Sequence, residues 1–74
     1  MNDKIFEVDG TVIGAHQGMK FLVEIEVGEK KRNILCNLSG KMKIHYIKIV
    51  LGDRVMLEVK SCDPTKGRII YRYK

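Results

Sequence analysis

The hydrophobic pattern of the chain changes at the segment Ser39-Gly40-Lys41-Met42-Lys43-Ile44-His45-Tyr46-Ile47. On both sides of this segment apolar residues recur at every second position, which is typical of β-strands. Inside it, Met42 and Tyr46 are four residues apart, a spacing that places two side chains on one face of a helix. Ser39 is a residue type that caps helix N-termini. The segment therefore predicts a short helix over residues 41–47.

Three strands are predicted before this helix, separated by turns at His16-Gln17-Gly18 and at Gly28-Glu29-Lys30. Gly10 and Gly14 lie inside the first strand and indicate a sharp bend or a bulge, as small barrels require. The third strand is expected over residues 31–37. One face of each strand is apolar, and the residues of these three faces are Phe6, Val8, Gly10 and Val12, then Phe21, Val23, Ile25 and Val27, then Ile34, Cys36 and Leu38.

Two more strands are predicted after the helix. In the fourth, Val55, Leu57 and Val59 alternate with other residues. The segment 63–67, Asp-Pro-Thr-Lys-Gly, predicts a turn, because proline fixes one backbone dihedral and glycine closes the loop. The fifth strand runs from Arg68 to about Tyr73. Simple alternation directs Ile69 and Tyr71 into the core, and Arg68, Ile70 and Arg72 to the opposite face.

The order of three strands, a short helix and two strands is that of the OB-fold, an all-β, five-stranded Greek-key barrel that binds oligonucleotides. An SH3-like barrel is the main alternative, but it usually lacks a helix between its third and fourth strands. With 74 residues the chain has room for a single domain, residues 1–74.

The net positive charge of the chain favours a polyanionic partner. Fourteen Lys and Arg against nine Asp and Glu give a net charge of +5, which favours nucleic acid as a partner, whereas a surface charged only for solubility is the alternative. The acids gather early in the chain, and the bases gather over residues 30–48 and 66–74. This separation predicts one basic face.

Other classes of function lack their signatures. Cys36 and Cys62 are far apart and distant in sequence from His16 and His45, so neither a disulfide framework nor a zinc site is expected. No nucleophile elbow or phosphate loop is present, so we expect no catalysis and no cofactor. No signal peptide or membrane span is recognised, which predicts a cytoplasmic protein without a membrane partner.

The candidate RNA-binding residues are cations on or beside the helix and the fifth strand, with one interleaved aromatic residue. Tyr46 is a candidate for stacking on a base, and its alternative place is half-buried under the helix. The second and third strands carry no run of exposed aromatic residues, so binding to the shape and phosphates of folded RNA is favoured. The candidates are Lys41, Lys43, Tyr46, Lys48, Lys66, Arg68 and Arg72.

Several motifs resemble those of bacterial translation initiation factor one. The central motif is Ser39-Gly40-Lys41-Met42, followed by Tyr46-Ile47-Lys48-Ile49 and Gly52-Asp53-Arg54-Val55. The C-terminal motif is Thr65-Lys66-Gly67-Arg68-Ile69-Ile70-Tyr71-Arg72. Gly10-Thr11-Val12 and Phe21-Leu22-Val23-Glu24 are similar to the family's first two strands, so the resemblance extends over nearly the whole chain.

The resemblance implies an OB-fold without enzymatic activity. It implies binding to the RNA of the small ribosomal subunit, at the aminoacyl site of the decoding region, and occlusion of that site during initiation. Initiation factors two and three are the implied protein partners, and a monomer is expected off the ribosome. Carried over by position, the RNA-contacting residues are Lys41, Lys43, Lys48, Lys66, Arg68 and Arg72.

The chain also departs from the family pattern. Lys43 stands where arginine is usual, Ile44 where lysine is common, and Lys20 where methionine is frequent. The loop from Gly28 to Ser39 is longer and more basic than usual, with Lys30, Lys31 and Arg32. These departures indicate a divergent lineage, either an organelle-encoded copy or a divergent bacterium. A general single-stranded nucleic-acid-binding or RNA-chaperone module and a protein-binding barrel remain as alternative functions.

Overall fold

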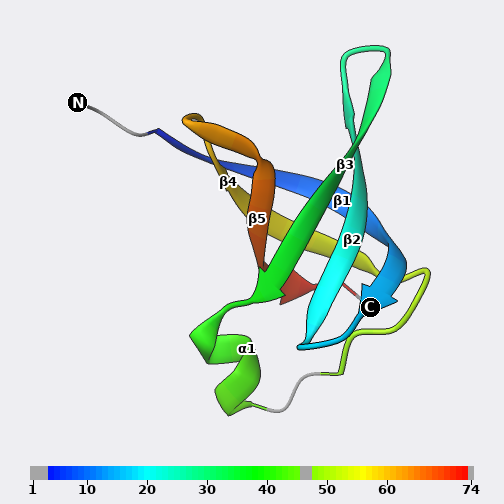
Figure 1. The fold of residues 1–74 in the computed structure, drawn as a ribbon, viewed down its shortest axis with the longest axis vertical. Coiled ribbons are helices and arrows are strands. Elements are labelled where there is room, and N and C mark those ends of the chain that lie inside the picture. Colours follow the sequence, from blue (N-terminus) through cyan, green and yellow to red (C-terminus); the bar gives the residue numbers. More distant parts are fainter. Residues whose placement is uncertain (1–3, 46–47, 74) are drawn as a thin grey trace.

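The computed structural model describes residues 4–45 and 48–73, and within them it has five strands and one helix (Figure 1). These elements are β1 (Ile5–His16), β2 (Lys20–Val27), β3 (Lys30–Leu38), α1 (Gly40–Ile44), β4 (Arg54–Lys60) and β5 (Asp63–Arg72). The strands close into a barrel in the order β1-β2-β3-β5-β4, with β3 and β5 parallel and the other pairs antiparallel. This confirms the predicted OB-fold barrel with its helix between β3 and β4.

Strand β1 closes the barrel because it pairs with β2 on one side and β4 on the other. Gly10 lies where the two ladders overlap, opposite both Ile25 and Val55. A Cβ atom at Gly10 would lie 2.5 Å from Cγ1 of Val23 and 2.8 Å from the backbone oxygen of Glu24, so no side chain fits there. The β1–β2 register shifts between Val12 and Gly14, and this bulge confirms the predicted irregularity.

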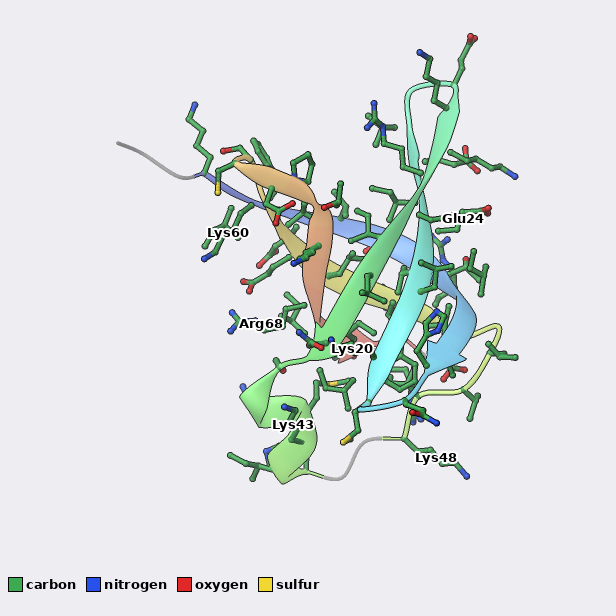
Figure 2. The ribbon with its side chains drawn as sticks, in the orientation of Figure 1. Lys20, Glu24, Lys43, Lys48, Lys60 and Arg68 are labelled. Atoms are coloured by element: carbon green, nitrogen blue, oxygen red, sulfur yellow. The ribbon has the colours of Figure 1, made fainter. Side chains whose placement is uncertain are left out.

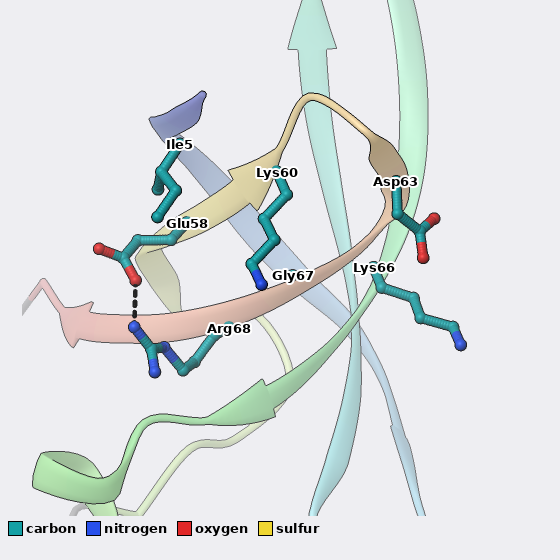
Figure 3. A pocket seen from close by; sticks show the side chains of 7 residues that line it. All are labelled: Ile5, Glu58, Lys60, Asp63, Lys66, Gly67 and Arg68. Atoms are coloured by element: carbon teal, nitrogen blue, oxygen red, sulfur yellow. Dashed lines mark hydrogen bonds and ion pairs between the residues drawn. The ribbon is translucent and has the colours of Figure 1, made fainter. Parts of the chain in front are cut away.

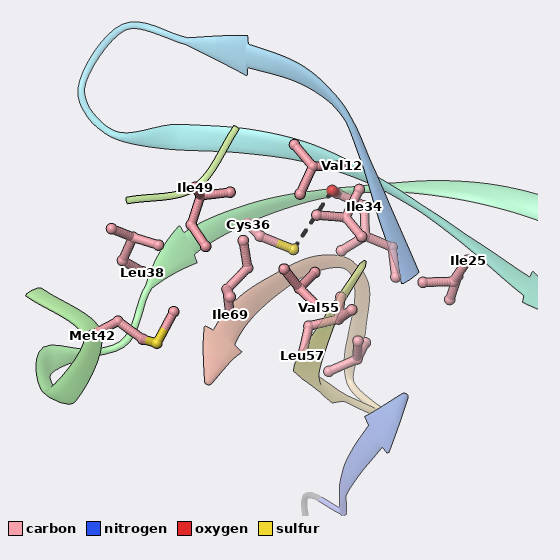
Figure 4. Packing of buried hydrophobic residues seen from close by; sticks show 12 residues of the cluster. Val12, Ile25, Ile34, Cys36, Leu38, Met42, Ile49, Val55, Leu57 and Ile69 are labelled. Carbon is pink, nitrogen blue, oxygen red and sulfur yellow. Dashed lines mark hydrogen bonds between the residues drawn. The ribbon is translucent and has the colours of Figure 1, made fainter. Parts of the chain in front are cut away.

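The core consists of the alternating apolar faces of the strands, closed at one end by α1 (Figure 4). The predicted inward faces of β3 and β4 are confirmed, and that of β2 is confirmed at Val23 and Ile25, whereas Val27 at the end of β2 is 53% exposed. The remaining members of the buried cluster are Val12, Ile34, Cys36, Leu38, Met42, Ile49, Val55, Leu57, Val59 and Ile69.

Helix α1 begins as the sequence indicates. The Oγ of Ser39 accepts a hydrogen bond from the backbone N–H of Met42 at 3.2 Å, which satisfies one of the free donors of the first turn. Met42 is buried against the barrel. The helix ends at Ile44, and the predicted continuation through Tyr46 and Ile47 lies outside the described residues.

The predicted turn at 63–67 is wrong. The chain turns at residues 61–62, and Asp63 already belongs to β5, paired with Lys60. The next β4–β5 pair joins Val59 to Gly67, so Pro64 and its two successors bulge out of that ladder. Proline has no N–H to donate and is tolerated at such a bulge, and Thr65 donates from Oγ1 to the Asp63 carboxylate at 2.7 Å.

The predicted alternation of β5 is also wrong beyond Ile69. Leu57 pairs with Ile69 and Met56 with Tyr71, so Ile70 is an extra residue in β5. A bulge of one residue reverses which face the following side chains take. Tyr71, predicted to be core, is therefore 55% exposed. Arg72, predicted to share a face with Arg68, is half-buried opposite the core residue Val55.

The predicted hairpin turn after Val27 is confirmed, and it is a two-residue turn of Gly28 and Glu29. Val27 pairs directly with Lys30, and Gly28 has a φ of 64°, the left-handed conformation that glycine adopts at little cost. The residues from Lys30 to Leu38 form β3. Figure 1 shows the β2–β3 hairpin extending beyond the rest of the barrel. The additional residues noted between Gly28 and Ser39 therefore lengthen a pair of strands.

Candidate nucleic-acid interface

Helix α1 presents two of the predicted lysines. Lys41 and Lys43 are exposed, while Met42 between them is buried and anchors the helix. The helix starts beside β5, because the backbone N–H of Ser39 donates to the carbonyl oxygen of Ile69 at 2.9 Å. Arg68 immediately precedes Ile69, so the helix and the β5 cations border one surface.

The sheet next to α1 carries a polar row across three strands. Lys20 on β2 pairs with Asn37 on β3, and Asn37 pairs with Arg68 on β5. Directly opposite residues point to the same face, and all three are exposed (Figure 2). Two strand spacings separate the backbones of Lys20 and Arg68 by about 10 Å. Sequence reasoning missed Lys20 and Asn37 as site residues, because only the register brings them beside Arg68.

Arg68 also borders a shallow groove on the outer face of β4 and β5 (Figure 3). The groove has a volume of about 550 Å³. Its cations are Lys60, Lys66 and Arg68, and Glu58 pairs with Arg68 at 2.5 Å. Sequence reasoning missed Lys60, which comes from β4 and gave no motif signal. The residues that line the groove are Ile5, Glu58, Lys60, Asp63, Lys66, Gly67 and Arg68.

Asp63 at the edge of this groove is held in its charged form. The hydroxyl of Thr65 donates to its carboxylate and lowers the pKa of Asp63, and the positive charge of Lys66 acts in the same direction. With Glu58 the groove therefore contains two carboxylates against three cations. The excess of positive charge is modest here, so the groove alone is a weaker anion site than its cations suggest.

Arg72 contacts the backbone of Lys48, whereas the sequence predicted that both side chains are available to RNA. The guanidinium of Arg72 donates from Nη1 to the backbone oxygen of Lys48. Arg72 therefore ties the segment after α1 to the end of β5, and part of its donor capacity is used inside the protein. The side chain of Lys48 is exposed.

Among the tyrosines, Tyr71 does not lie in the core as the sequence predicted. Tyr46 lies outside the described residues. Tyr71 and Tyr73 form an edge-to-face pair with ring centroids 5.2 Å apart. The hydroxyl of Tyr73 donates to the Asp9 carboxylate at 2.8 Å, and this hydrogen bond raises the pKa of Tyr73. Tyr71 leaves half of its surface open to solvent, which makes it available to a base.

A second groove has the opposite charge. It lies on β1, β2 and β4, has a volume of about 500 Å³, and contains Asp9, Glu24 and Glu26 with Arg54 as its one cation. Arg54 donates to Oγ1 of Thr11 at 3.1 Å. Three of the acids from the first part of the sequence thus gather in one groove.

Neither cysteine is placed for metal binding. Cys36 is buried in the core, and burial raises the pKa of its thiol to about 12. Cys62 is exposed in the β4–β5 turn. Within residues 4–45 and 48–73, no three His, Cys, Asp or Glu side chains gather as a metal site would require. No helix in the described part of the chain has the length and apolar character needed to span a membrane.

The barrel is similar to a solved translation initiation factor, and the match covers almost all of this chain. The solution structure of translation initiation factor one from the Wolbachia endosymbiont strain TRS of Brugia malayi is similar, with 36% sequence identity and a TM-score of 0.74. The match covers 95% of this chain and 79% of that one. The chain belongs to the initiation factor one family. The motif resemblance is thereby confirmed, and the chain is assigned as a translation initiation factor.

The same barrel occurs within a larger protein. The crystal structure of YjeQ from Thermotoga maritima is similar to this member of the initiation factor one family, with 31% identity and a TM-score of 0.71. That match covers 93% of this chain but 23% of YjeQ. No protein-family profile matches the chain. Among the residues that resemble initiation factor one, Ser39 of the central motif caps α1, and the C-terminal motif lies within β5.

Proposed function

We propose that this member of the initiation factor one family binds RNA of the small ribosomal subunit at the aminoacyl site of the decoding region, and occludes that site during initiation. The observation that carries the proposal is a group of exposed cations on α1 and on the sheet beside it, in the barrel of a translation initiation factor. The group comprises Lys41 and Lys43 on α1 with Arg68 and Lys20 on the adjoining strands. We define these four residues as the α1–β5 surface.

The chemistry of this surface suits phosphates of a folded RNA. Lysine acts as a mobile point charge, while the planar guanidinium of Arg68 can make two parallel hydrogen bonds to one phosphate. Arg68 must exchange Glu58 for the phosphate on binding. Its side chain is 57% exposed, and exposed ion pairs contribute at most about 1 kcal/mol, so the exchange costs little.

The remaining parts of the proposal follow from family membership. The protein acts in the cytoplasm or its organellar equivalent, as a monomer off the ribosome, alongside initiation factors two and three. It is not an enzyme and works by occupying space. Lys48 and Lys66 are further phosphate contacts, and Tyr46 is proposed to contact RNA from the segment that follows α1.

Loss of the α1 lysines tests the proposal. Lys41→Ala with Lys43→Ala should weaken binding to isolated small subunits, because both side chains are exposed on α1 and belong to the surface proposed to contact RNA. Each lost phosphate contact should lower the slope of log affinity against log salt by about one. Lys31→Ala is the control, since Lys31 lies away from this surface and pairs with Glu24. An affinity and slope equal to those of the control would contradict the proposal.

General binding of single-stranded nucleic acid is the second candidate, and the exposed ring of Tyr71 is the observation that favours it. The two functions differ in the preferred ligand. The proposed function requires tighter binding to small subunits than to an unstructured oligonucleotide at the same salt concentration. Equal or tighter binding to the oligonucleotide, lost in Tyr71→Ala, would favour the second candidate.

A further inference from the structure

The end of the β2–β3 hairpin stands free of the barrel. The β1–β2 ladder ends at the pair Gly10–Ile25, and the β3–β5 ladder begins at the pair Leu35–Lys66. Residues 26–33 therefore form a two-stranded segment with no third strand on either edge, which we call the ribbon (Figure 1). The α1–β5 surface does not include it.

The register sorts the charges of the ribbon onto two faces. Val27 pairs with Lys30, and Ile25 pairs with Arg32, so these side chains share one face. Glu26 pairs with Lys31 and Glu24 with Asn33, and they take the other face. The first face carries two cations and no carboxylate, and we call it the cationic face. Glu29 lies in the turn itself.

The two cations of this face are available to a ligand. Within the described residues the ion pairs are Lys31–Glu24, at 4.0 Å, and Arg68–Glu58. Lys30 and Arg32 belong to neither, and both are exposed. The stem of Arg32 lies opposite the buried Ile25, so apolar packing can hold the guanidinium outward at the base of the ribbon.

We propose that the cationic face of the ribbon contacts the phosphate backbone of double-helical RNA, as a second contact beside the α1–β5 surface. Lys30 and Arg32 are two residues apart on one strand face, about 7 Å, so their long side chains can reach neighbouring phosphates. The wide, shallow minor groove of an RNA helix admits such a ribbon and is read by shape and phosphate contacts. This inference rests on the proposed function, because it assumes a ribosomal RNA partner.

Two other partners fit the ribbon less well. Single-stranded RNA is bound by aromatic side chains on which bases stack, and residues 26–33 contain none. A protein partner requires an apolar patch at the centre of its interface. The cationic face offers only Val27, which is 53% exposed, as such a residue. A charged, non-aromatic ribbon matches duplex RNA better than either.

The test compares two double variants of the full chain. Lys30→Gln with Arg32→Gln removes both charges of the cationic face. The control, Lys4→Gln with Lys31→Gln, removes one exposed charge before β1 and one from the opposite face of the ribbon. Binding is measured over a salt series to small subunits, to ribosomal RNA freed of protein, and to a short RNA duplex. We expect the first variant to lose roughly tenfold in affinity for all three, with a salt slope lower by about one per cation. Thermal melts of both variants should match the unchanged protein, because these side chains are exposed.

Other outcomes overturn the inference in distinguishable ways. Equal binding of the two double variants would contradict the ribbon proposal, and Lys41→Ala with Lys43→Ala, measured in parallel, would then show whether the proposed function survives. If the ribbon variant loses affinity for intact subunits but keeps it for both protein-free RNAs, the ribbon contacts a ribosomal protein. A loss of affinity for subunits and ribosomal RNA with unchanged affinity for the short duplex would contradict duplex recognition.

Discussion

Arg68 and Arg72 show how a single backbone irregularity gives the same side chain two roles. Both belong to β5 and would share a face in a regular strand. Because Ile70 is an extra residue, Arg68 points outward to Glu58, whereas Arg72 turns inward and donates to the backbone of Lys48. Arg68 can exchange Glu58 for a phosphate of the proposed RNA partner at little cost in free energy. Arg72 instead joins the end of β5 to the segment after α1.

The structure reverses the predicted environments of the Tyr71 and Arg72 side chains, so removing Arg72 should destabilise the fold more than removing Tyr71. Tyr71→Ala should leave the thermal midpoint nearly unchanged, because the ring is 55% exposed and its main neighbour is Tyr73. Arg72→Ala should cost about 1 kcal/mol through the lost hydrogen bond, a shift of roughly 4–8 °C in a domain of this size. Thermal melts of the two variants test whether Arg72→Ala lowers the midpoint more than Tyr71→Ala does.

Ile69→Ala is the positive control for those melts, since Ile69 is completely buried and such deletions cost about 2–5 kcal/mol. A Tyr71 variant as unstable as the Ile69 variant would show that β5 is regular and that the bulge at Ile70 is absent.

Cys36 makes stability depend on pH at the alkaline end. Its thiol has a pKa of about 12 in the folded protein against 9.0 ordinarily, because burial disfavours the thiolate. The unfolded chain therefore releases this proton first, and the free energy of unfolding should fall between pH 9 and 12, by up to about 1.4 kcal/mol per pH unit. Below pH 9 the thiol is protonated in both states and has no such effect.

Chemical denaturation at pH 8 and pH 10.5 checks this, with Cys36→Ala as the comparison. The variant is expected to be less stable at pH 8 but to lose less on going to pH 10.5. Identical losses in the two proteins would show that Cys36 is not the group responsible.

At the scale of elements, the sequence predicted what depends on one strand alone. The alternation in β2, β3 and β4 was sufficient because each strand has one face buried in the barrel, and Ser39 was recognised because a cap acts on its own helix. The bulge at Ile70 and the row from Lys20 to Arg68 depend on neighbouring strands. A one-residue offset is invisible until the partner strand is known, so Lys20 could not be assigned to the α1–β5 surface from the sequence.

Gly10 lies where β1 and β2 approach each other too closely for a side chain on β1. Gly10→Ala should destabilise the barrel by about 1–3 kcal/mol or prevent folding, because the new methyl group would collide with Val23 and with the backbone of Glu24. Gly40→Ala is the matched control, since nothing lies within 4 Å of a Cβ there and alanine favours helix. Denaturant melts of both variants measure the effect, and equal stability would contradict the close approach at Gly10.

At the scale of the whole molecule, the barrel separates its charges. The α1–β5 surface is cationic, the groove of Asp9, Glu24 and Glu26 is acidic, and the ribbon carries one cationic face of its own. Phosphates of the proposed RNA partner would be repelled by the acidic groove and attracted by the α1–β5 surface, which would favour one orientation of the protein. The positions of charged residues along the sequence predicted a basic face. The two grooves, however, could be recognised only from the closed barrel.

The most direct test of the central claim is chemical footprinting of the small ribosomal subunit with and without the protein. The account predicts protection of nucleotides at the aminoacyl site of the decoding region by the unchanged protein. That protection should be lost in Lys41→Ala with Lys43→Ala at the same concentration and retained in Lys31→Ala. Absence of protection at that site, or a footprint that the α1 lysines do not affect, would contradict it.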